Sequence, residues 1–126
     1  STGSGWYVQI SAAGVFVAVG YYDPTPETLA AIRRAIADDR SGTNLLKLLA
    51  GLERKGWTRG GAMLKTKPQG YAADHPHIEL LRHKSLVLHK SYGFDEVIHT
   101  PKLLPMIRSD WRAARPLVDW VGTYSS

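Results

Sequence analysis

The chain has 126 residues, of which 44% are hydrophobic, and it carries a formal net charge of +5. This length corresponds to one domain, and the hydrophobic content is typical of a chain that folds around an apolar core rather than of a disordered one. The absence of cysteine excludes disulfides, thiolate metal sites and cysteine nucleophiles, and no apolar run is long enough to span a membrane.

A β-hairpin is predicted at the N-terminus, after a flexible lead-in at residues 1–5. Residues 6–11 place apolar side chains at every second position, which is the period of a strand, and residues 15–20 do the same with β-branched valines. The small residues at 12–14 are predicted to form the turn between these strands.

The first helix is predicted to begin at Pro26, because Thr25 is a good N-cap and proline suits the first helical position. Its end is predicted at residues 38–42, with the sequence Asp-Asp-Arg-Ser-Gly. This boundary places Asp38 and Asp39 at the negative end of the helix dipole, where acids are unfavourable.

A second helix is predicted to follow, with Thr43 or Asn44 as its cap. Lys55 and Gly56 supply the cation and the left-handed residue that commonly end a helix. Residues 57–65 are predicted to form a strand that bends at its pair of glycines. The buried face of the helix is marked by four leucines at helical spacing: Leu45, Leu48, Leu49 and Leu52.

The next segment is rich in histidine. A Pro/Gly loop is predicted over residues 67–73, a short helix capped by Asp74 over 75–83, and a strand over 85–90 that ends at 92–93. Four of the five histidines lie in this segment: His75, His77, His83 and His89.

The last helix is predicted to begin after the cap Thr100, and to kink at Pro116, which lacks the amide hydrogen that a helix interior requires. Strands occur both in a hairpin and between helices, which favours the α+β class. We therefore predict an antiparallel or mixed sheet packed against several helices, with residues 6–126 forming a single domain. The core stripe of the last helix is predicted to comprise Leu104, Ile107, Trp111, Ala114, Val118 and Val121.

Asp74, His75 and His77 form the sharpest group of polar residues in the chain. Two imidazoles beside a carboxylate can bind a divalent metal, or can supply an acid and a base. In a helix, however, side chains two positions apart point about 200° away from each other, which is poor spacing for metal ligands. We therefore expect no metal site, and His75 remains a candidate acid or base.

Six basic residues and one acid lie between Lys47 and Lys67, and such a patch attracts phosphates, carboxylates, nucleic acid or an acidic partner. The loop at 65–71 presents two lysines beside a predicted helix N-terminus, as anion-binding loops do. Arg82 suits a carboxylate, because a guanidinium can donate two parallel hydrogen bonds to it, and Asp74 is an alternative partner for Arg82 within the chain. A solvated surface is an equally open interpretation of this charge.

Aromatic residues near the predicted strands could stack on nucleic-acid bases. At strand spacing, however, packing in the core or across strands is the favoured interpretation, and nucleic-acid binding is the least favoured function. The aromatic residues concerned are Trp6, Tyr7, Tyr21, Tyr22 and Trp57.

Four segments carry a resemblance to a known family: residues 6–22, 26–33, 68–85 and 117–120. The third is the most specific, because it combines Pro-x-Gly-Tyr-x-x-Asp-His-Pro with a later Leu-Leu-Arg-x-Lys-Ser. From Ser4 onward the chain resembles the later part of a bacterial and fungal family known as domain of unknown function 2461. The resemblance implies that members are longer at the N-terminus, and that a separate fragment or another copy completes the sheet of this chain. It implies no activity.

We hypothesise a cytoplasmic domain that binds a small anionic or phosphate-bearing ligand, without a cofactor, through its basic and histidine-rich region at 59–90. In a catalytic version of this site, His75 is the acid or base and Arg82 stabilises charge. The alternative is a non-catalytic module whose basic face docks an acidic protein or another copy of the chain; no membrane partner is expected. The predicted site comprises Arg59, Lys65, Lys67, Tyr71, Asp74, His75, Arg82 and Lys84.

Overall fold

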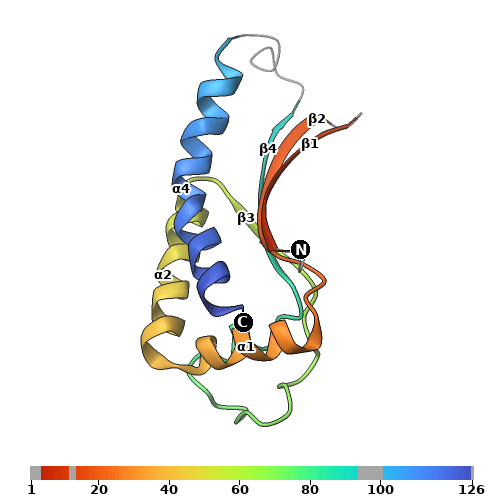
Figure 1. The fold of residues 1–126 in the computed structure, drawn as a ribbon, viewed down its shortest axis with the longest axis vertical. Coiled ribbons are helices and arrows are strands. Elements are labelled where there is room, and N and C mark those ends of the chain that lie inside the picture. The colour runs from red at the N-terminus through yellow and green to blue at the C-terminus, as the bar shows by residue number, and fades with distance from the viewer. Residues whose placement is uncertain (1–3, 12–13, 94–100, 126) are drawn as a thin grey trace.

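The computed structural model describes residues 4–11, 14–93 and 101–125, and it shows a four-stranded sheet with helices on one face (Figure 1). The predicted α+β class and the N-terminal hairpin are confirmed, and every neighbouring pair of strands is antiparallel. In sheet order, the strands are β1 (Ser4–Ser11), β2 (Gly14–Tyr21), β4 (Leu86–Gly93) and β3 (Thr58–Gly60).

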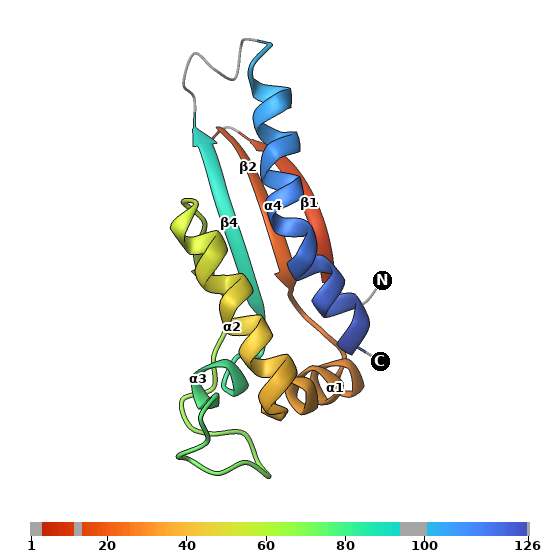
Figure 2. The same cartoon turned by 90° about the vertical axis from the view of Figure 1, so that its left-hand side faces the viewer.

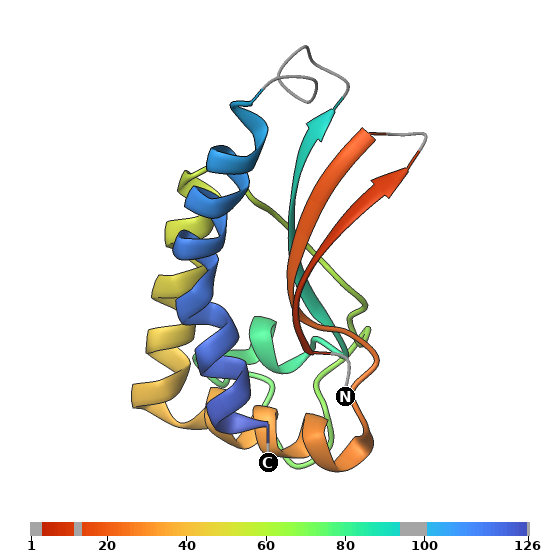
Figure 3. The ribbon, with the colours of Figure 1, turned by 45° about the horizontal axis from the view of Figure 1, so that its top comes forward.

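The helices are α1 (Pro26–Ala37), α2 (Asp39–Arg54), α3 (Ile78–Leu81) and α4 (Leu103–Tyr124). Helix α4 packs against β1 and β2, and α2 packs against α4 and α1. Figure 2 shows α2 and α4 side by side in front of the sheet, with α1 crossing beneath their lower ends. Figure 3 shows the two layers from a direction in which the sheet and the helices separate clearly.

The core lies between these two layers. Strand β2 supplies side chains at alternate positions, and its Val19 and Tyr21 lie opposite Leu88 and Leu86 of β4. Burial of this apolar surface stabilises the two-layer arrangement. Of the aromatic residues considered for base stacking, Tyr21 and Trp57 are buried in the core, as the packing interpretation predicts, whereas Tyr22 is exposed. The side chains of Trp6 and Tyr7 lie outside the described part of the structure.

The junction between α1 and α2 differs from the prediction. Helix α2 begins at Asp39, several residues before the predicted caps Thr43 and Asn44. The Asp38 carboxylate accepts hydrogen bonds from the amides of Arg40 (2.9 Å) and Ser41 (3.3 Å), so it caps α2. Asp38 therefore ends α1 and begins α2, and its position at the positive end of the second helix dipole offsets its unfavourable position at the negative end of the first.

Other local signals in this half of the chain are confirmed. The Thr25 hydroxyl accepts a hydrogen bond from the Thr28 amide (3.1 Å) and caps α1. Three of the four leucines of the predicted α2 face are buried and Leu48 is half-buried. Gly56 adopts the left-handed conformation expected after the helix, with a φ of 96°. The strand predicted over 57–65 is shorter, since β3 ends at Gly60 and beyond it Met63 pairs singly with His83.

The segment around Asp74 also differs from the prediction. Helix α3 has four residues and is preceded by His77, so Asp74 caps no helix and is exposed. Residues 72–78 form consecutive turns, in which the His75 amide bonds to the Ala72 carbonyl and the Ile78 amide to the His75 carbonyl. The His75 ring stabilises the turn before α3, because its Nδ1 accepts a hydrogen bond from the His77 amide (3.0 Å), but no side chain caps the helix itself.

Two boundaries in the last part of the chain were placed wrongly. Strand β4 continues through Tyr92, which is buried, to Gly93. Helix α4 begins at Leu103 and continues through Pro116 as one element, while the predicted cap Thr100 lies outside the described residues. Within the predicted stripe, Ala114 and Val121 are buried, but Leu104 is 55% exposed. Leu117 and Trp120, which were not assigned to the stripe, are buried.

Candidate anion-binding site

Three of the predicted cations surround one hollow, here called the Arg82 groove. It has a volume of about 490 Å³ and lies between the loop after β3 and helix α3. The side chains of Lys65, Lys67 and Arg82 line it, and Glu79 is the acid in its described lining. The groove therefore carries an excess of positive charge, which favours an anion.

Arg82 holds the loop that presents the two lysines. Its Nε donates to the Leu64 carbonyl (3.0 Å) and its Nη2 to the Lys65 carbonyl (3.2 Å). The Leu64 amide in turn donates to the Arg82 carbonyl (2.7 Å). These three contacts fix the start of the loop, and the buried Pro68 fixes its other end, so both lysines project from a segment held at two points.

Asp74, one of the two carboxylate partners considered for Arg82, does not form an ion pair with it. Within the described ranges, the carboxylate nearest to Arg82 is that of Glu79, whose Oε1 lies 3.6 Å from Nη1. The Glu79 side chain is 75% exposed, so solvent screens this pair and its contribution is small. Arg82 thus retains a charge that can act on a ligand in the groove.

Three aromatic rings of residues 71–77 lie close to one another. The Tyr71 and His75 rings meet edge to face with centroids 6.4 Å apart, and the His75 and His77 centroids are 5.8 Å apart. Because His75 Nδ1 is an acceptor, the proton of its neutral ring lies on Nε2. His77 is buried against α2, and neither of its ring nitrogens has a hydrogen-bond partner among the described residues.

The remaining predicted site residues are not brought into the groove. Tyr71 lines a different cavity, and Lys84 lines a third hollow together with Asp23. Arg59 lies on β3, where its Nη2 is 2.6 Å from Glu53 Oε1. Asp74 is exposed. The structure therefore joins three of the eight predicted residues around one hollow and distributes the others over the neighbouring surface.

A larger hollow, of about 610 Å³, lies where α1, α2 and the end of α4 meet. Arg34 and Arg40 line it, but so does Asp38. The Asp38 carboxylate already accepts hydrogen bonds from amides at the start of α2, so it occupies the place that an anion would take at this helix N-terminus. This hollow is therefore a poorer anion site than the Arg82 groove.

A family model described as a conserved hypothetical protein, DUF2461, matches residues 1–120. The chain belongs to this family. No curated protein and no solved structure matches the chain. The family assignment agrees with the resemblance seen in the sequence. The family's description names no activity, so the chemistry of the DUF2461 chain follows from its own residues.

Two segments on which the family resemblance rests meet in space. Pro26, Leu29 and Arg33 from the first turns of α1 and Tyr71 from the later motif line the same cavity. Arg33 was not selected from the sequence, because on a helix an arginine is most simply explained as a solvated side chain. The signal that could have selected it is its spacing of four residues from Leu29, which places both side chains on one side of α1.

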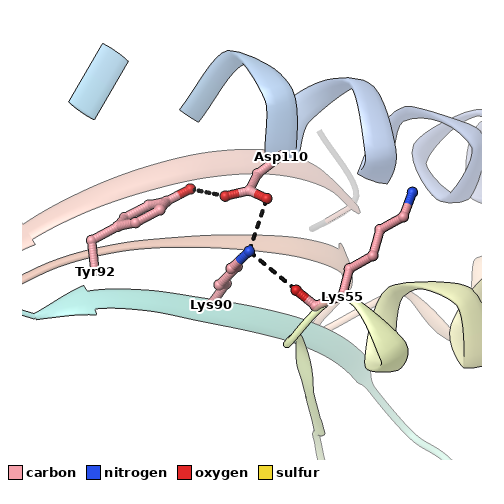
Figure 4. Close-up of polar contacts among 4 residues, drawn as sticks. All are labelled: Lys55, Lys90, Tyr92 and Asp110. Atoms are coloured by element: carbon pink, nitrogen blue, oxygen red, sulfur yellow. Dashed lines mark hydrogen bonds and ion pairs between the residues drawn. The ribbon is translucent and has the colours of Figure 1, made fainter. Parts of the chain in front are cut away.

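A second group that the sequence did not reveal joins α4, β4 and the end of α2 (Figure 4). The Asp110 carboxylate accepts hydrogen bonds from the Tyr92 hydroxyl and from Lys90 Nζ (3.0 Å). Lys90 Nζ also donates to the Lys55 carbonyl at the C-terminus of α2 (3.1 Å). The DUF2461 chain thus carries a partly buried Asp–Lys–Tyr network. Its members lie far apart in the sequence, so no short motif predicts it.

No group of three or more His, Asp or Glu side chains that could hold a metal ion occurs in the described part of the DUF2461 chain. The described helices include none that is both long enough and apolar enough to cross a membrane.

His83 should make folding stability sensitive to acid. Burial lowers the pKa of its ring, and the Arg59 and Arg82 charges lower it further, against the opposing hydrogen bond to the Ser85 carbonyl (2.9 Å). An unfolded histidine binds its proton near pH ~6.5, before the folded ring does, so the free energy of unfolding should decrease as the pH falls from about 7 to about 5. We expect His83→Gln to flatten this decrease in denaturant titrations. An identical slope in both proteins would show that other groups control the acid response.

Proposed function

We propose that this DUF2461 chain binds a small phosphate- or carboxylate-bearing ligand in the Arg82 groove. The convergence of Lys65, Lys67 and Arg82 on one hollow of about 490 Å³ carries this proposal. Lysine ammonium groups act as mobile point charges, and the anchored Arg82 guanidinium adds a fixed one. Because His75 lies outside the described lining, the proposal assigns it no catalytic step.

Inorganic phosphate is the simplest probe of this groove. We expect a phosphate titration, followed by amide NMR, to shift signals of the loop at 65–67 and of Arg82. Replacing both Lys65 and Lys67 with alanine should weaken binding by about tenfold or more, since one charge-assisted hydrogen bond contributes roughly 1.5–3 kcal/mol. Lys47→Ala is the matched control, because Lys47 is an exposed lysine on α2 outside the groove. Unchanged affinity in the double variant would contradict the proposal.

A non-catalytic interaction module is the second candidate. Arg108, Arg112 and Arg115 are exposed and lie on one side of α4, at the spacing i, i+4, i+7. Leu104 and Met106 are exposed near the start of the same helix. Cations beside apolar side chains suit an acidic protein partner. This candidate predicts that inorganic phosphate leaves the amides of the groove unchanged, so the same titration separates the two functions.

A further inference from the structure

A second cavity, here called the Arg33 cavity, lies between α1 and the loop at 69–71. It has a volume of about 320 Å³, which is at the lower end of the range for small-molecule sites. Arg33 and Arg34 provide two guanidinium groups in its lining, and Gln69 and Tyr71 provide an amide and a phenol. All four side chains can donate hydrogen bonds, so the cavity is equipped to bind an acceptor with several lone pairs.

Arg33 is held in place but its charge is not neutralised within the described structure. Its Nε donates to the Leu81 carbonyl (3.1 Å), which ties α1 to the end of α3. Its Nη2 is buried and has no hydrogen-bond partner among the described residues. Because this nitrogen is inaccessible to solvent, a ligand in the cavity reaches only the rest of the guanidinium, whose charge no described carboxylate neutralises.

The buried hydroxyl of Tyr21 lies within the electrostatic reach of Arg33. Burial raises the pKa of Tyr21 and the Arg33 charge opposes this rise. This hydroxyl also lacks a hydrogen-bond partner in the described ranges. Two unsatisfied polar groups that influence each other at the inner side of α1 are unusual in a folded protein, where buried polar atoms are generally paired.

The composition of the lining distinguishes this cavity from the Arg82 groove. Among the described residues that line it there is no acid, whereas Glu79 reduces the positive charge of the groove. The rest of its wall is apolar and consists of Pro26, Leu29 and Ala30. A ligand with a charged end and an apolar body would therefore satisfy both parts of the cavity, whereas a bare inorganic anion would leave the apolar wall uncovered.

We propose that the Arg33 cavity binds a small organic carboxylate, whose carboxylate group is held by Arg33 and Arg34 and whose apolar body lies on Pro26 and Leu29. Planar guanidinium groups bind carboxylates through paired hydrogen bonds, which gives this class of ligand both strength and orientation. The Gln69 amide and the Tyr71 hydroxyl provide the remaining donors. This site is separate from the proposed phosphate site, and neither depends on the other.

Benzoate is a suitable probe, because it combines one carboxylate with a flat apolar ring. We expect a benzoate titration to shift the amide NMR signals of Arg33, Arg34, Gln69 and Tyr71, with weaker effects from inorganic phosphate at equal ionic strength. Arg34→Ala should weaken benzoate binding by about tenfold, the loss expected for one charge-assisted hydrogen bond. Arg34 is exposed, so this variant keeps the core intact.

The matched control is Arg112→Ala, which removes an exposed arginine of α4 outside the cavity and should leave benzoate affinity unchanged. The double alanine variant of Lys65 and Lys67 should also bind benzoate normally, which separates this site from the groove. Benzoate that leaves the four cavity amides unshifted, or that binds Arg34→Ala as tightly as the parent protein, would overturn the assignment. Phosphate binding there as tightly as benzoate would overturn the choice of an organic carboxylate.

Discussion

Replacing Gly42 with alanine should destabilise the protein by ~2 kcal/mol or more, although alanine is the better helix former by about 1 kcal/mol. Gly42 lies inside α2, where an added Cβ would be 2.1 Å from the Ile36 carbonyl oxygen and 2.8 Å from Cδ2 of the His77 ring. The first of these atoms belongs to the backbone and cannot rotate away. The steric cost should therefore exceed the gain in helix propensity.

Gly51 offers a control within the same helix. The atom nearest to a Cβ added there is Nη2 of Arg54, at 3.8 Å, which is an ordinary contact with a flexible side chain. Gly51→Ala should stabilise the protein by ~0.5–1 kcal/mol through helix propensity alone. Urea denaturation of the parent and both variants measures the free energy of unfolding, which should decrease in Gly42→Ala and increase in Gly51→Ala. If Gly42→Ala proved as stable as Gly51→Ala, the close packing of α2 on the end of α1 and on His77 would be wrong.

The same glycine shows where prediction from sequence reached its limit. The start of α1 at Thr25 and the end of α2 at Gly56 were predicted correctly, because caps and stops are local features. Residues 38–42 contain acids, serine and glycine, which suit the end of one helix and the start of another equally well. In the structure Asp38 caps α2, and Gly42 then lies against Ile36 and His77, a contact with His77 that cannot be read from the local sequence.

For the candidate sites too, features within one segment could be predicted and contacts between distant segments could not. Lys65 and Lys67 could be selected because they share one short loop, and the structure places both beside Arg82. Arg33 could not be connected with Tyr71, because their common cavity exists only after α1 has packed next to the later loop. Asp74 was selected for a capping role that required a longer helix than the chain forms. Sequence reasoning thus located the region of charge but not the partners of each side chain.

Asp110→Asn should destabilise the protein by roughly 2 kcal/mol, the range for loss of charge-assisted hydrogen bonds. The Asp110 side chain is 13% exposed and accepts hydrogen bonds from both Lys90 and Tyr92. Lys90 also binds the Lys55 carbonyl, so the carboxylate supports a cation that joins the end of α2 to α4 and β4. An amide at this position keeps the shape but leaves the ammonium without its counter-ion. Thermal and urea denaturation measure the loss.

Asp119→Asn is the matched control for this network. Asp119 is also an acid on α4, but its oxygen lies 4.0 Å from Arg115 Nε and both side chains are more than two-thirds exposed. Its removal should change stability by less than ~0.5 kcal/mol, because solvent screens such pairs. Equal effects of the two substitutions would show that the Asp110 network adds no more than a surface ion pair.

Ionisation of Tyr92 provides a second readout that a general loss of packing would not reproduce. Burial raises the pKa of Tyr92, and its hydrogen bond to the Asp110 carboxylate raises it further. The neutral phenol is therefore favoured in the folded state, and its contribution to stability is complete at neutral pH and decreases as the pH rises above about 10. Asp110→Asn should lower the pH at which Tyr92 ionises, measured by tyrosinate absorbance, whereas Asp119→Asn should not. A titration curve unchanged by Asp110→Asn would mean that the phenol and the carboxylate are not in contact.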